Sequence, residues 1–425
     1  MNKKHNILIV GGGGREHAIA WKLKQSEKVG KLYALPGNAG IAEIAECHGD
    51  IKATDIDKIL DFVDSHPDIY MTVVAPDDPL AMGLVNRLEE RGHRAFGPRA
   101  EAAVIEASKA FSKNLMKKYG IPTAAYEVFD SADKAHEYVN TCDLPVVLKA
   151  DGLALGKGVL ICDTRESAHA AVKELMEDRA FGAAGGKVVI ESFLVGEEVS
   201  VLAYCDGKTV KPMPASRDHK RALDGDKGLN TGGMGTYSPV PFYTDALAKT
   251  AMKEIFVPTV NAMASEGRPF KGVLYFGLML SSDGIRVLEY NARFGDPEAQ
   301  VVLPRLKSDL FDVFEAVIDG TLDKLDIEYR DEACVCVVAA SGGYPEKYEK
   351  GKPITFDGVP DDIIVFHAGT AKKDGKTVTS GGRVLGVTAL GKDLKSARAN
   401  AYEGIKHIGF DGMYYRKDIC TPKDV

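Results

Sequence analysis

The first hundred residues alternate between short apolar runs and amphipathic stretches. The apolar runs lie at 7–10, 31–35, 69–74 and 94–96, and the stretch 15–24 places apolar side chains at helical spacing. Uninterrupted apolar runs are typical of strands that are buried on both faces of a parallel sheet. Because helical patterns follow the strands, the sequence predicts an N-terminal doubly wound parallel sheet.

A run of four glycines, 11–14, separates the first predicted strand from the first predicted helix. The N-terminus of a helix attracts anions. The dinucleotide fingerprint fails here, because its third glycine would fall on Glu16 and the second strand ends in Pro-Gly-Asn instead of an acid. Ligands of such sheets bind beyond the carboxyl ends of the strands, where both the glycines and Asp77 are expected. A smaller phosphate ligand therefore fits this loop better than a dinucleotide.

Two lysines flank a glycine-rich loop in the middle of the chain. The runs 145–149 and 159–161 are typical of strands; Lys149 ends the first run, and Lys157 lies just before the second. Glycines let backbone amides approach an anion closely, so this hairpin suits a polyphosphate. It is not a Walker loop, because no Ser or Thr follows the Gly-Lys and the next segment resembles a strand. An ordinary hairpin with solvated lysines is the alternative.

The preceding stretch, 101–120, has helical spacing and ends at a Gly-Ile-Pro sequence that stops a helix. It carries four lysines: Lys109, Lys113, Lys117 and Lys118. We expect one continuous helix here, with most of these lysines on a solvated face.

The apolar run 188–190 predicts a strand that ends in an acidic residue, Glu191. Phe193 and Leu194 follow Glu191 closely, and another strand begins near residue 196. A strand end with free backbone groups and a nearby acid could bind the edge of an adenine. Each of these residues taken singly is more often structural.

Two polar stretches follow, a dense mixed-charge segment at 216–222 and a glycine-rich turn at 230–235. Together they predict a mobile loop and not a packed element. A plain surface loop is the alternative.

The most informative pattern is a hairpin later in the chain. An Asp-Gly turn signal joins apolar runs at 273–280 and 285–291, so the two strands should pair. Residues two apart in a strand share a face, so Glu289 and Asn291 point the same way, with Arg293 just beyond. Their oxygens are hard ligands suited to Mg²⁺, which completes its shell with phosphate oxygens and water. An exposed polar face is the alternative.

The C-terminal part contains short apolar runs, at 333–339, 363–366 and 383–388, separated by turn residues. This spacing predicts a β-rich region. Cys334 and Cys336 alternate within the first run, and we expect them to be core thiols and not metal ligands. The chain has seven cysteines and no Cys-x-x-Cys pair, which is typical of a protein of a reducing cytosol.

Composition and charge exclude several classes of protein. The chain has 425 residues, a length typical of about three domains, with 45% hydrophobic and 27% charged residues. A net charge of −7 argues against a nucleic-acid or membrane-surface binder, so an anionic substrate needs a local positive site. Four apolar residues before the glycines are too few for a signal peptide, and no run reaches membrane-spanning length. We expect a cytoplasmic protein.

Seven stretches distributed over nearly the whole chain match one known pattern. They are VGGGGREHAI (10–19), LKADGLALGKGV (148–159), ESFLVGEEVS (191–200), DHKR (218–221), NTGGMG (230–235), EYNARFGDPE (289–298) and GGRVLGV (381–387). Singly most of them are weak signals, but their order and spacing are specific. Together they resemble the phosphoribosylamine–glycine ligase (glycinamide ribonucleotide synthetase) family of the ATP-grasp superfamily.

The resemblance implies an α/β and α+β multidomain chain with an ATP-grasp fold, an N-terminal doubly wound parallel-sheet (pre-ATP-grasp) domain and a C-terminal β-rich domain. It implies a substrate-binding N-terminal domain over residues 1–103. The main ATP-grasp domain would comprise 104–125 and 195–328, around a lid subdomain at 126–194. Residues 329–425 would form the C-terminal domain.

The resemblance also implies a reaction. A carbon–nitrogen ligase of de novo purine (IMP) biosynthesis would convert ATP, glycine and 5-phosphoribosylamine into glycinamide ribonucleotide, ADP and phosphate, through glycyl phosphate. ATP is then a substrate, and Mg²⁺ or Mn²⁺ is the metal. We expect a monomer with these small-molecule substrates, no nucleic-acid or membrane partner, and at most a transient contact with the preceding pathway enzyme.

Carried over position by position, the resemblance implies four sets of functional residues. The ATP-binding residues are Lys109, Lys149, Lys157, Glu191, Phe193, Leu194 and Glu198. The residues that bind the other substrates are Gly13, Arg15, Glu16, Asp218, Lys220, Arg293 and Asp296. The catalytic residues are Lys157, Lys220 and Arg293. The metal ligands are Glu289 and Asn291.

Two features depart from the family pattern. Ala75-Pro76-Asp77 stands where the family has Gly-Pro-Glu, and the shorter acid puts a ribose contact there in doubt. Many ATP-grasp enzymes also carry an acid in the strand before the metal pair, whereas 273–280 contains none. The metal should therefore depend more on phosphate and water.

Two alternatives remain at this stage. The first is another ATP-grasp enzyme of purine synthesis, which carboxylates aminoimidazole ribonucleotide or formylates glycinamide ribonucleotide; the DHK and NARFGDPE stretches favour the glycine ligase. The second is a catalytically silent nucleotide-binding or scaffolding protein. Five intact residues argue against it: Lys149, Lys157, Glu289, Asn291 and Arg293.

Overall fold

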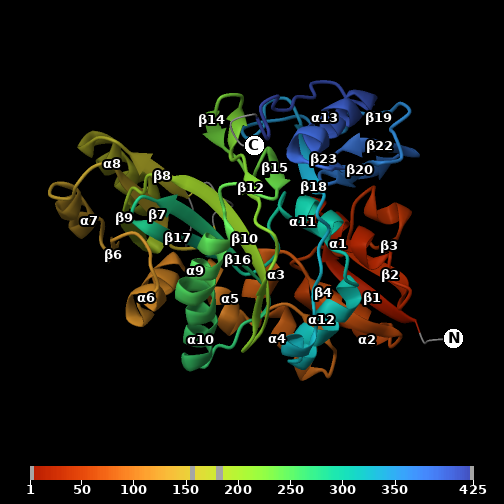
Figure 1. Ribbon diagram of the computed structural model, residues 1–425, viewed down its shortest axis with the longest axis horizontal. Coiled ribbons are helices and arrows are strands. Elements are labelled where there is room, and N and C mark those ends of the chain that lie inside the picture. The colour runs from red at the N-terminus through yellow and green to blue at the C-terminus, as the bar shows by residue number, and fades with distance from the viewer. Residues whose placement is uncertain (1–3, 154–157, 179–184, 422–425) are drawn as a thin grey trace.

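The computed structural model describes residues 4–153, 158–178 and 185–421. In Figure 1 the N-terminal region (red) and the C-terminal region (blue) lie at one end of the long axis. The helices α7 and α8 lie at the other end, and the central sheet lies between them. Within the described residues, no helix is both long and apolar enough to cross a bilayer.

The N-terminal region contains a five-stranded parallel sheet in the order β3-β2-β1-β4-β5, which confirms the predicted sheet. The strand order reverses between β1 and β4, so the loops after these two strands meet at one edge. The elements are β1 (His5–Gly11), α1 (Gly14–Leu23), β2 (Val29–Pro36), η1 (Ile41–Glu43), β3 (Glu46–Cys47), α2 (Ile56–Ser65), β4 (Ile69–Val74), α3 (Asp77–Ala81), α4 (Leu84–Glu90) and β5 (Ala95–Phe96).

The single helix expected over 101–120 is wrong, because the structure has two helices, α5 (Ala100–Ala107) and α6 (Lys109–Tyr119). Ser108 interrupts them with extended backbone, and its hydroxyl accepts a hydrogen bond from the N–H of Phe111 at 3.0 Å, as an N-cap does. Its hydroxyl also donates to Asp151 at 2.9 Å, which anchors the break to the lid. Lys117 and Lys118 are exposed as expected, whereas Lys113 is buried.

The lid forms an antiparallel sheet in the order β6-β9-β7-β8, with a hydrophobic core of its own. Leu148 and Ile190 from the sheet pack in that core with Val172 from α8. The lid elements are β6 (Tyr126–Phe129), α7 (Ala132–Val139), β7 (Val146–Ala150), β8 (Val159–Cys162), α8 (Arg165–Val172), η2 (Lys173–Glu177) and β9 (Val188–Ser192).

The central sheet is antiparallel in the order β11-β10-β16-β17 and carries the predicted hairpin as β16 and β17. Phe314 of α12 stacks on Phe96 of β5 with ring centroids 3.8 Å apart, and this contact joins the central region to the N-terminal sheet. The central elements are β10 (Glu197–Asp206), β11 (Val210–Pro212), α9 (Asp245–Ala251), η4 (Met252–Phe256), α10 (Val257–Ser265), β16 (Lys271–Ser281), β17 (Gly284–Asn291), α11 (Ala299–Arg305), α12 (Leu310–Asp319) and η5 (Leu322–Lys324).

The prediction of an unpacked loop between residues 216 and 235 is wrong at the two ends of the segment, which are packed, whereas residues 223–229 are exposed. The segment contains short strands. They are β12 (Arg217–Asp218), β13 (Arg221–Leu223), β14 (Lys227–Asn230) and β15 (Gly235–Ser238). His219 and Met234 are buried, and β15 pairs with β18 of the C-terminal region. The ends of the segment therefore serve tertiary pairing, and its middle is a surface hairpin of β13 and β14.

The C-terminal region is β-rich, as predicted, and its main sheet has the order β12-β15-β18-β23-β20. Cys334 and Cys336 are buried free thiols in β18, which confirms that they belong to the core. The domain boundaries given above stay predictions. The C-terminal elements are β18 (Ala333–Ala340), β19 (Thr355–Phe356), β20 (Ile363–His367), β21 (Thr370–Lys373), β22 (Lys376–Thr379), β23 (Arg383–Gly391), α13 (Leu394–Gly404), η6 (Ile405–His407) and β24 (Ile408–Gly409).

Two buried histidines lie where α1 meets β20. The backbone N–H of His367 donates to Nδ1 of His17 at 2.8 Å, so this nitrogen of His17 carries no proton. Burial lowers the pKa of His17 to about 3 and the pKa of His367 to about 4. Both side chains therefore stay neutral in the folded protein at pH values where an unfolded chain binds protons.

We expect the free energy of unfolding to fall as the pH drops below about 6.5, the pKa of an unperturbed histidine. The unfolded state then binds protons that the folded state rejects, and the slope is up to about 1.4 kcal/mol per pH unit for each histidine. Unfolding curves between pH 7 and pH 4.5 measure this slope. His17→Gln should flatten it, whereas His407→Gln, at a ring that contacts a surface carbonyl, should leave it unchanged.

Candidate active site

A cleft of about 1760 Å³ lies between the lid, the central sheet, the N-terminal loops and a C-terminal loop. It brings together most of the residues that the sequence singled out: Arg15, Lys109, Lys149, Glu191, Phe193, Leu194, Glu198, Asp218, Lys220, Glu289, Asn291, Arg293 and Asp296. Gly13 and Glu16 lie behind Arg15 in the first glycine loop and do not line the cleft. Lys157 lies outside the described residues.

On the lid side of the cleft, one buried carboxylate binds two lysines. Glu191, at the end of β9, forms ion pairs with Lys149 of β7 and with Lys113 of α6. Although burial opposes its charge, the two lysines lower the pKa of Glu191, so it stays ionised. Lys149 also donates to the carbonyl of Leu288 at 3.2 Å, which connects the lid to β17.

Lys109 lies at the first turn of α6 and reaches the glycine-rich loop of the lid. Its ammonium donates to the carbonyl of Gly152 at 2.9 Å. Burial lowers the pKa of Lys109, while the nearby charge of Glu289 opposes that shift. The loop is therefore attached to α6 by a group that also faces the central sheet.

Glu289 and Asn291 lie on β17, opposite Gly277 and Tyr275 of β16. A register shift in the hairpin follows Gly277, whose lack of a side chain leaves room for the methylenes of Glu289, 3.1 Å from where a Cβ would lie. Burial opposes the charge of Glu289, but nearby cations, with Lys220 the strongest, lower its pKa. The carboxylate is therefore ionised.

Glu289 and Asn291 are the side chains that would hold a metal ion in this cleft. No group of three or more His, Cys, Asp or Glu side chains in the described part of the chain could hold a metal by itself. An ionised carboxylate and an amide oxygen nevertheless match the hard donors that Mg²⁺ and Mn²⁺ bind, and such sites obtain their other ligands from phosphate and water. The donor set therefore fits a metal that arrives with a polyphosphate.

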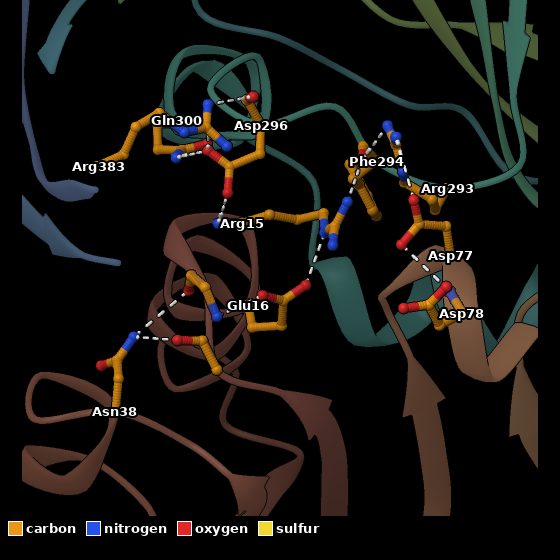
Figure 2. A network of polar contacts seen from close by, with 12 residues as sticks. Arg15, Glu16, Asn38, Asp77, Asp78, Arg293, Phe294, Asp296, Gln300 and Arg383 are labelled. Atoms are coloured by element: carbon orange, nitrogen blue, oxygen red, sulfur yellow. Dashed lines mark hydrogen bonds and ion pairs between the residues drawn. The ribbon is translucent and has the colours of Figure 1, made fainter. Parts of the chain in front are cut away.

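Arg293 follows β17, and Figure 2 shows it between Asp77 and the carbonyl of Phe294. Its Nη2 lies 2.8 Å from Glu106, 3.1 Å from the amide oxygen of Asn291 and 3.9 Å from Asp77. Its buried Nε has no hydrogen-bond partner among the described residues. Burial raises the pKa of Glu106, and the charge of Arg293 opposes this shift. Arg293 is thus held in place by protein acceptors where it lines the cleft.

Asp296 connects three regions of the chain, as Figure 2 shows. It accepts from the backbone N–H of Arg15 at 3.2 Å and from Gln300 at 2.9 Å, and it lies 3.5 Å from Arg383. Arg383 also donates to the carbonyls of Gly232 and Asp296, at 2.6 and 2.7 Å. The start of α1, the turn after β17 and the C-terminal sheet therefore meet at one carboxylate.

The four-glycine loop is stabilised by protein groups. Glu16 accepts from the N–H of Gly13 at 2.5 Å and from Nε of Arg15 at 2.6 Å. Asn38 donates to the carbonyl of Gly12 at 2.9 Å, and a Cβ at Gly12 would lie 2.3 Å from the carbonyl oxygen of Gly37. The glycine there permits close packing of two backbones.

The far wall of the cleft carries a second set of charges. Lys220 donates to Glu198 at 2.9 Å and lies 3.9 Å from Glu289, and these carboxylates raise its pKa although burial opposes its charge. Burial and the charge of Glu298 raise the pKa of Asp218. Glu298 is buried and accepts from Ser200 at 3.3 Å. Lys220 and Arg383 oppose this rise in the pKa of Asp218.

Sequence reasoning missed four residues that shape this cleft: Lys113, Glu106, Glu298 and Arg383. Lys113 lies one helical turn after Lys109 on α6, so helical spacing offered a signal. Glu298 and Arg383 lie within stretches that carried the resemblance but received no role. Glu106 had no local signal, because its partner Arg293 is far away in sequence.

A lid sheet that faces a central sheet across a cleft of lysines and hard oxygen donors defines the ATP-grasp class of ATP-dependent ligases. Biotin carboxylase of Campylobacter jejuni, solved as a complex with an ATP analogue, shares this fold with a TM-score of 0.75 at 14% identity, covering 96% of this chain and 92% of that one. Family models match at residues 5–106, 107–299 and 334–422, for the N, ATP-grasp (A) and C domains of phosphoribosylglycinamide synthetase. The chain belongs to the phosphoribosylamine–glycine ligase family.

Individual relatives agree with this family assignment over the full length. The phosphoribosylamine–glycine ligase of Halalkalibacterium halodurans is 50% identical over 415 residues, which cover 97% of this chain and 96% of the relative. The ligase of Neisseria meningitidis serogroup A is 49% identical over 417 residues, covering 97% and 98%. The crystal structure of the Thermotoga maritima ligase superposes with a TM-score of 0.86 at 37% identity, covering 97% of this chain and 100% of that one.

Proposed function

We propose that the chain ligates glycine to 5-phosphoribosylamine in purine biosynthesis, converting ATP to ADP and phosphate and releasing glycinamide ribonucleotide. The observation that carries this proposal is the opposition of Lys109 and Lys149 to Glu289, Asn291 and Arg293 across one cleft. Family membership supplies the identity of the substrates. Phosphoryl transfer chiefly needs positioning and neutralisation of charge, and both are available here.

The nucleotide would lie between the lid sheet and the central sheet. Lys109 and Lys149 would contact its phosphates, since both ammonium groups reach the cleft from the lid side. The adenine would lie beside Glu191 and the backbone of Phe193 and Leu194, with Glu198 near the ribose. Lys157 would join from the glycine-rich loop when the lid closes.

Glu289 and Asn291 would hold Mg²⁺ or Mn²⁺ against the phosphates. When bound there, the ion would neutralise the negative charge that spreads over the phosphate oxygens during transfer. The chain's own contribution is to keep Glu289 ionised and both oxygens on one face of β17.

In the first step, a carboxylate oxygen of glycine would attack the γ-phosphorus of ATP. The bond between this phosphorus and the bridging oxygen breaks, ADP leaves, and glycyl phosphate remains. Arg293 suits this step because it lines the cleft as a cation while Glu106 and Asn291 hold its Nη2. Phosphorylation turns a poor acyl donor into one with a good leaving group.

In the second step, the amine of phosphoribosylamine would attack the carbonyl carbon of glycyl phosphate. Phosphate leaves with the bonding electron pair, and the nitrogen loses a proton as the amide forms. Lys220 and Asp218 line the wall where this step would occur. Arg15 would bind phosphoribosylamine from the N-terminal loop, whereas the contacts of Gly13, Glu16 and Asp296 support a role in holding that loop in place.

We also propose that the protein acts in the cytoplasm as a monomer. Its substrates are small molecules, and a transient contact with the preceding pathway enzyme would shorten the free lifetime of the labile amine. Neither a nucleic acid nor a membrane takes part in this proposal.

The proposal is tested by measuring ADP release with ATP, Mg²⁺, glycine and freshly generated phosphoribosylamine, leaving out each component in turn. We expect full turnover only with the complete mixture, and glycinamide ribonucleotide in amounts equal to ADP. ADP release that depends on bicarbonate or formate, without a response to glycine, would contradict the proposal. An inactive protein that binds ATP would indicate a silent nucleotide-binding protein instead.

A further inference from the structure

The ion-pair cluster formed by Lys113, Glu191 and Lys149 has an unequal charge balance. One carboxylate lies between two ammonium groups, and each lysine pairs with a different carboxylate oxygen. The side chains of Glu191 and Lys113 are each 3% exposed, and that of Lys149 is 8% exposed. Lys149 alone would neutralise Glu191, so the second buried cation needs an explanation.

The two lysines differ in how they are held. Lys113 donates to the hydroxyl of Thr123 at 2.7 Å, and that hydroxyl donates to the carbonyl of Val287 at 2.7 Å. Lys113 is thereby attached to the central sheet by a neutral relay. Lys149 has a longer bond, 3.2 Å, to the carbonyl of Leu288, the neighbour of Glu289. Lys149 is thus the more weakly anchored of the two lysines on the central sheet, and its charge also acts on Glu289.

Transfer of Lys149 to a phosphate would leave Glu191 without that partner. A buried carboxylate that loses its only counter-charge is strongly destabilised, and breaking a buried ion pair typically costs several kcal/mol. Lys113 removes this obstacle, because it remains on the other carboxylate oxygen. Glu191 then stays ionised and in place beside the predicted adenine position.

We propose that Lys113 is a positioning residue that neutralises Glu191 while Lys149 moves to the nucleotide phosphates. This inference rests on the proposed nucleotide-binding role of Lys149. Lys113 itself touches no phosphate; it acts through Glu191. It thereby makes nucleotide affinity depend on a side chain of α6 that lies outside the sequence motifs.

A pH dependence follows from the surroundings of Lys113. It faces Glu191 on β9, Lys149 on β7 and the ring of Tyr126 on β6, whose centroid lies 5.8 Å from its Nζ. Burial lowers the pKa of Lys113 to about 8, although Glu191 opposes that shift. Above this pH Lys113 loses its charge, so nucleotide affinity should fall as the pH rises past 8.

The test is calorimetric titration of the full chain with Mg²⁺ and a non-hydrolysable ATP analogue, without glycine or phosphoribosylamine. We expect Lys113→Met to weaken binding at pH 7 by about 30-fold, the order expected for losing a hydrogen bond to a charged group. Lys117→Met, on the exposed face of the same helix, should bind as the wild type does. Lys113→Arg should bind like the wild type at pH 7 and should not weaken between pH 7 and pH 9.

A double-mutant cycle separates this role from general packing. In a Glu191→Gln background no carboxylate needs neutralising, so Lys113→Met should then change affinity less than threefold. An equal loss in both backgrounds, or a Lys113→Arg protein that still weakens above pH 8, would overturn the inference. If Lys113→Met does not fold, the inference is decided by the affinity of Lys113→Arg between pH 7 and pH 9. Wild-type protein that fails to bind the analogue would instead contradict the proposed function.

Discussion

Glu289→Gln is expected to lower the rate of product formation by roughly 10³-fold while the protein stays folded. The substitution keeps the size of the side chain and removes the negative charge of the pair on β17. Both protein groups that would hold a divalent ion would then be neutral amide oxygens. The ion would bind more weakly, and the negative charge that develops on the phosphate during transfer would be poorly neutralised. The measurement is ADP release with all three substrates at saturating concentration.

The Glu289→Gln protein should stay folded although four nearby cations lose a counter-charge, because the side chain is 36% exposed and water can reach the cleft. Its thermal unfolding midpoint should match that of Glu254→Gln, a control on the exposed surface of η4 that should retain full activity. A Glu289→Gln enzyme with more than a tenth of wild-type activity would remove Glu289 from the metal site. Weak activity that higher Mn²⁺ concentrations restore would support its role as a ligand.

Arg293→Met is expected to abolish product formation and also to lower the free energy of unfolding by about 3 kcal/mol. Arg293 and Glu106 form a largely buried pair, with side chains 18% and 8% exposed. Removing the cation leaves a buried carboxylate near Asp77; among the described residues, only the N–H of Ala292 then donates to it, at 2.6 Å. Thermal unfolding followed by circular dichroism, together with the ADP assay, measures both effects.

The double variant Arg293→Met/Glu106→Gln separates the two effects of this arginine. Replacing both partners of a buried pair removes the uncompensated charge, so most of the lost stability should return. Activity should not return, because the cation proposed to bind the glycine carboxylate is still missing. Arg87→Met, which breaks an exposed pair with Asp57, should change stability by less than about 1 kcal/mol. A double variant that regains activity would show that Arg293 is purely structural.

Local sequence patterns predicted the elements whose side chains follow a simple period. The apolar runs of β1 and β4 and the hairpin of β16 and β17 lie where expected, since burial on both faces or a tight turn determines them. The prediction of one helix over 101–120 failed because the hydroxyl of Ser108 accepts a backbone hydrogen bond and starts a second helix there. The prediction of an unpacked loop failed around β15 because the strand that pairs with it, β18, lies about a hundred residues further on in the sequence.

The residues of the candidate site also fall into two groups, those that local spacing brings together and those that only the tertiary fold brings together. Glu289 and Asn291 lie two apart on one strand, so the period of a strand is enough to bring them together. The pairs Glu106–Arg293 and Asp296–Arg383 join segments that only the tertiary fold brings near one another. Lys113 carried a misleading signal, because a lysine beside other lysines on a helix is usually solvated. Its burial depends on Glu191, which lies on another element.

The pairing of β15 with β18 also constrains the order in which the protein can fold during synthesis. Residues 235–238 leave the ribosome long before residues 333–340, and until then this strand lacks its neighbour in the C-terminal sheet. Domains made on the ribosome generally fold from the N-terminus onward. Here the five-stranded N-terminal sheet can form early, whereas β15 and its partner β12, which contains Asp218, complete their sheet only after β18 is made. A nascent chain that ends before β18 would therefore contain the lid sheet and β17, but the wall of the cleft formed around β12 and β15 would still lack its partner strand.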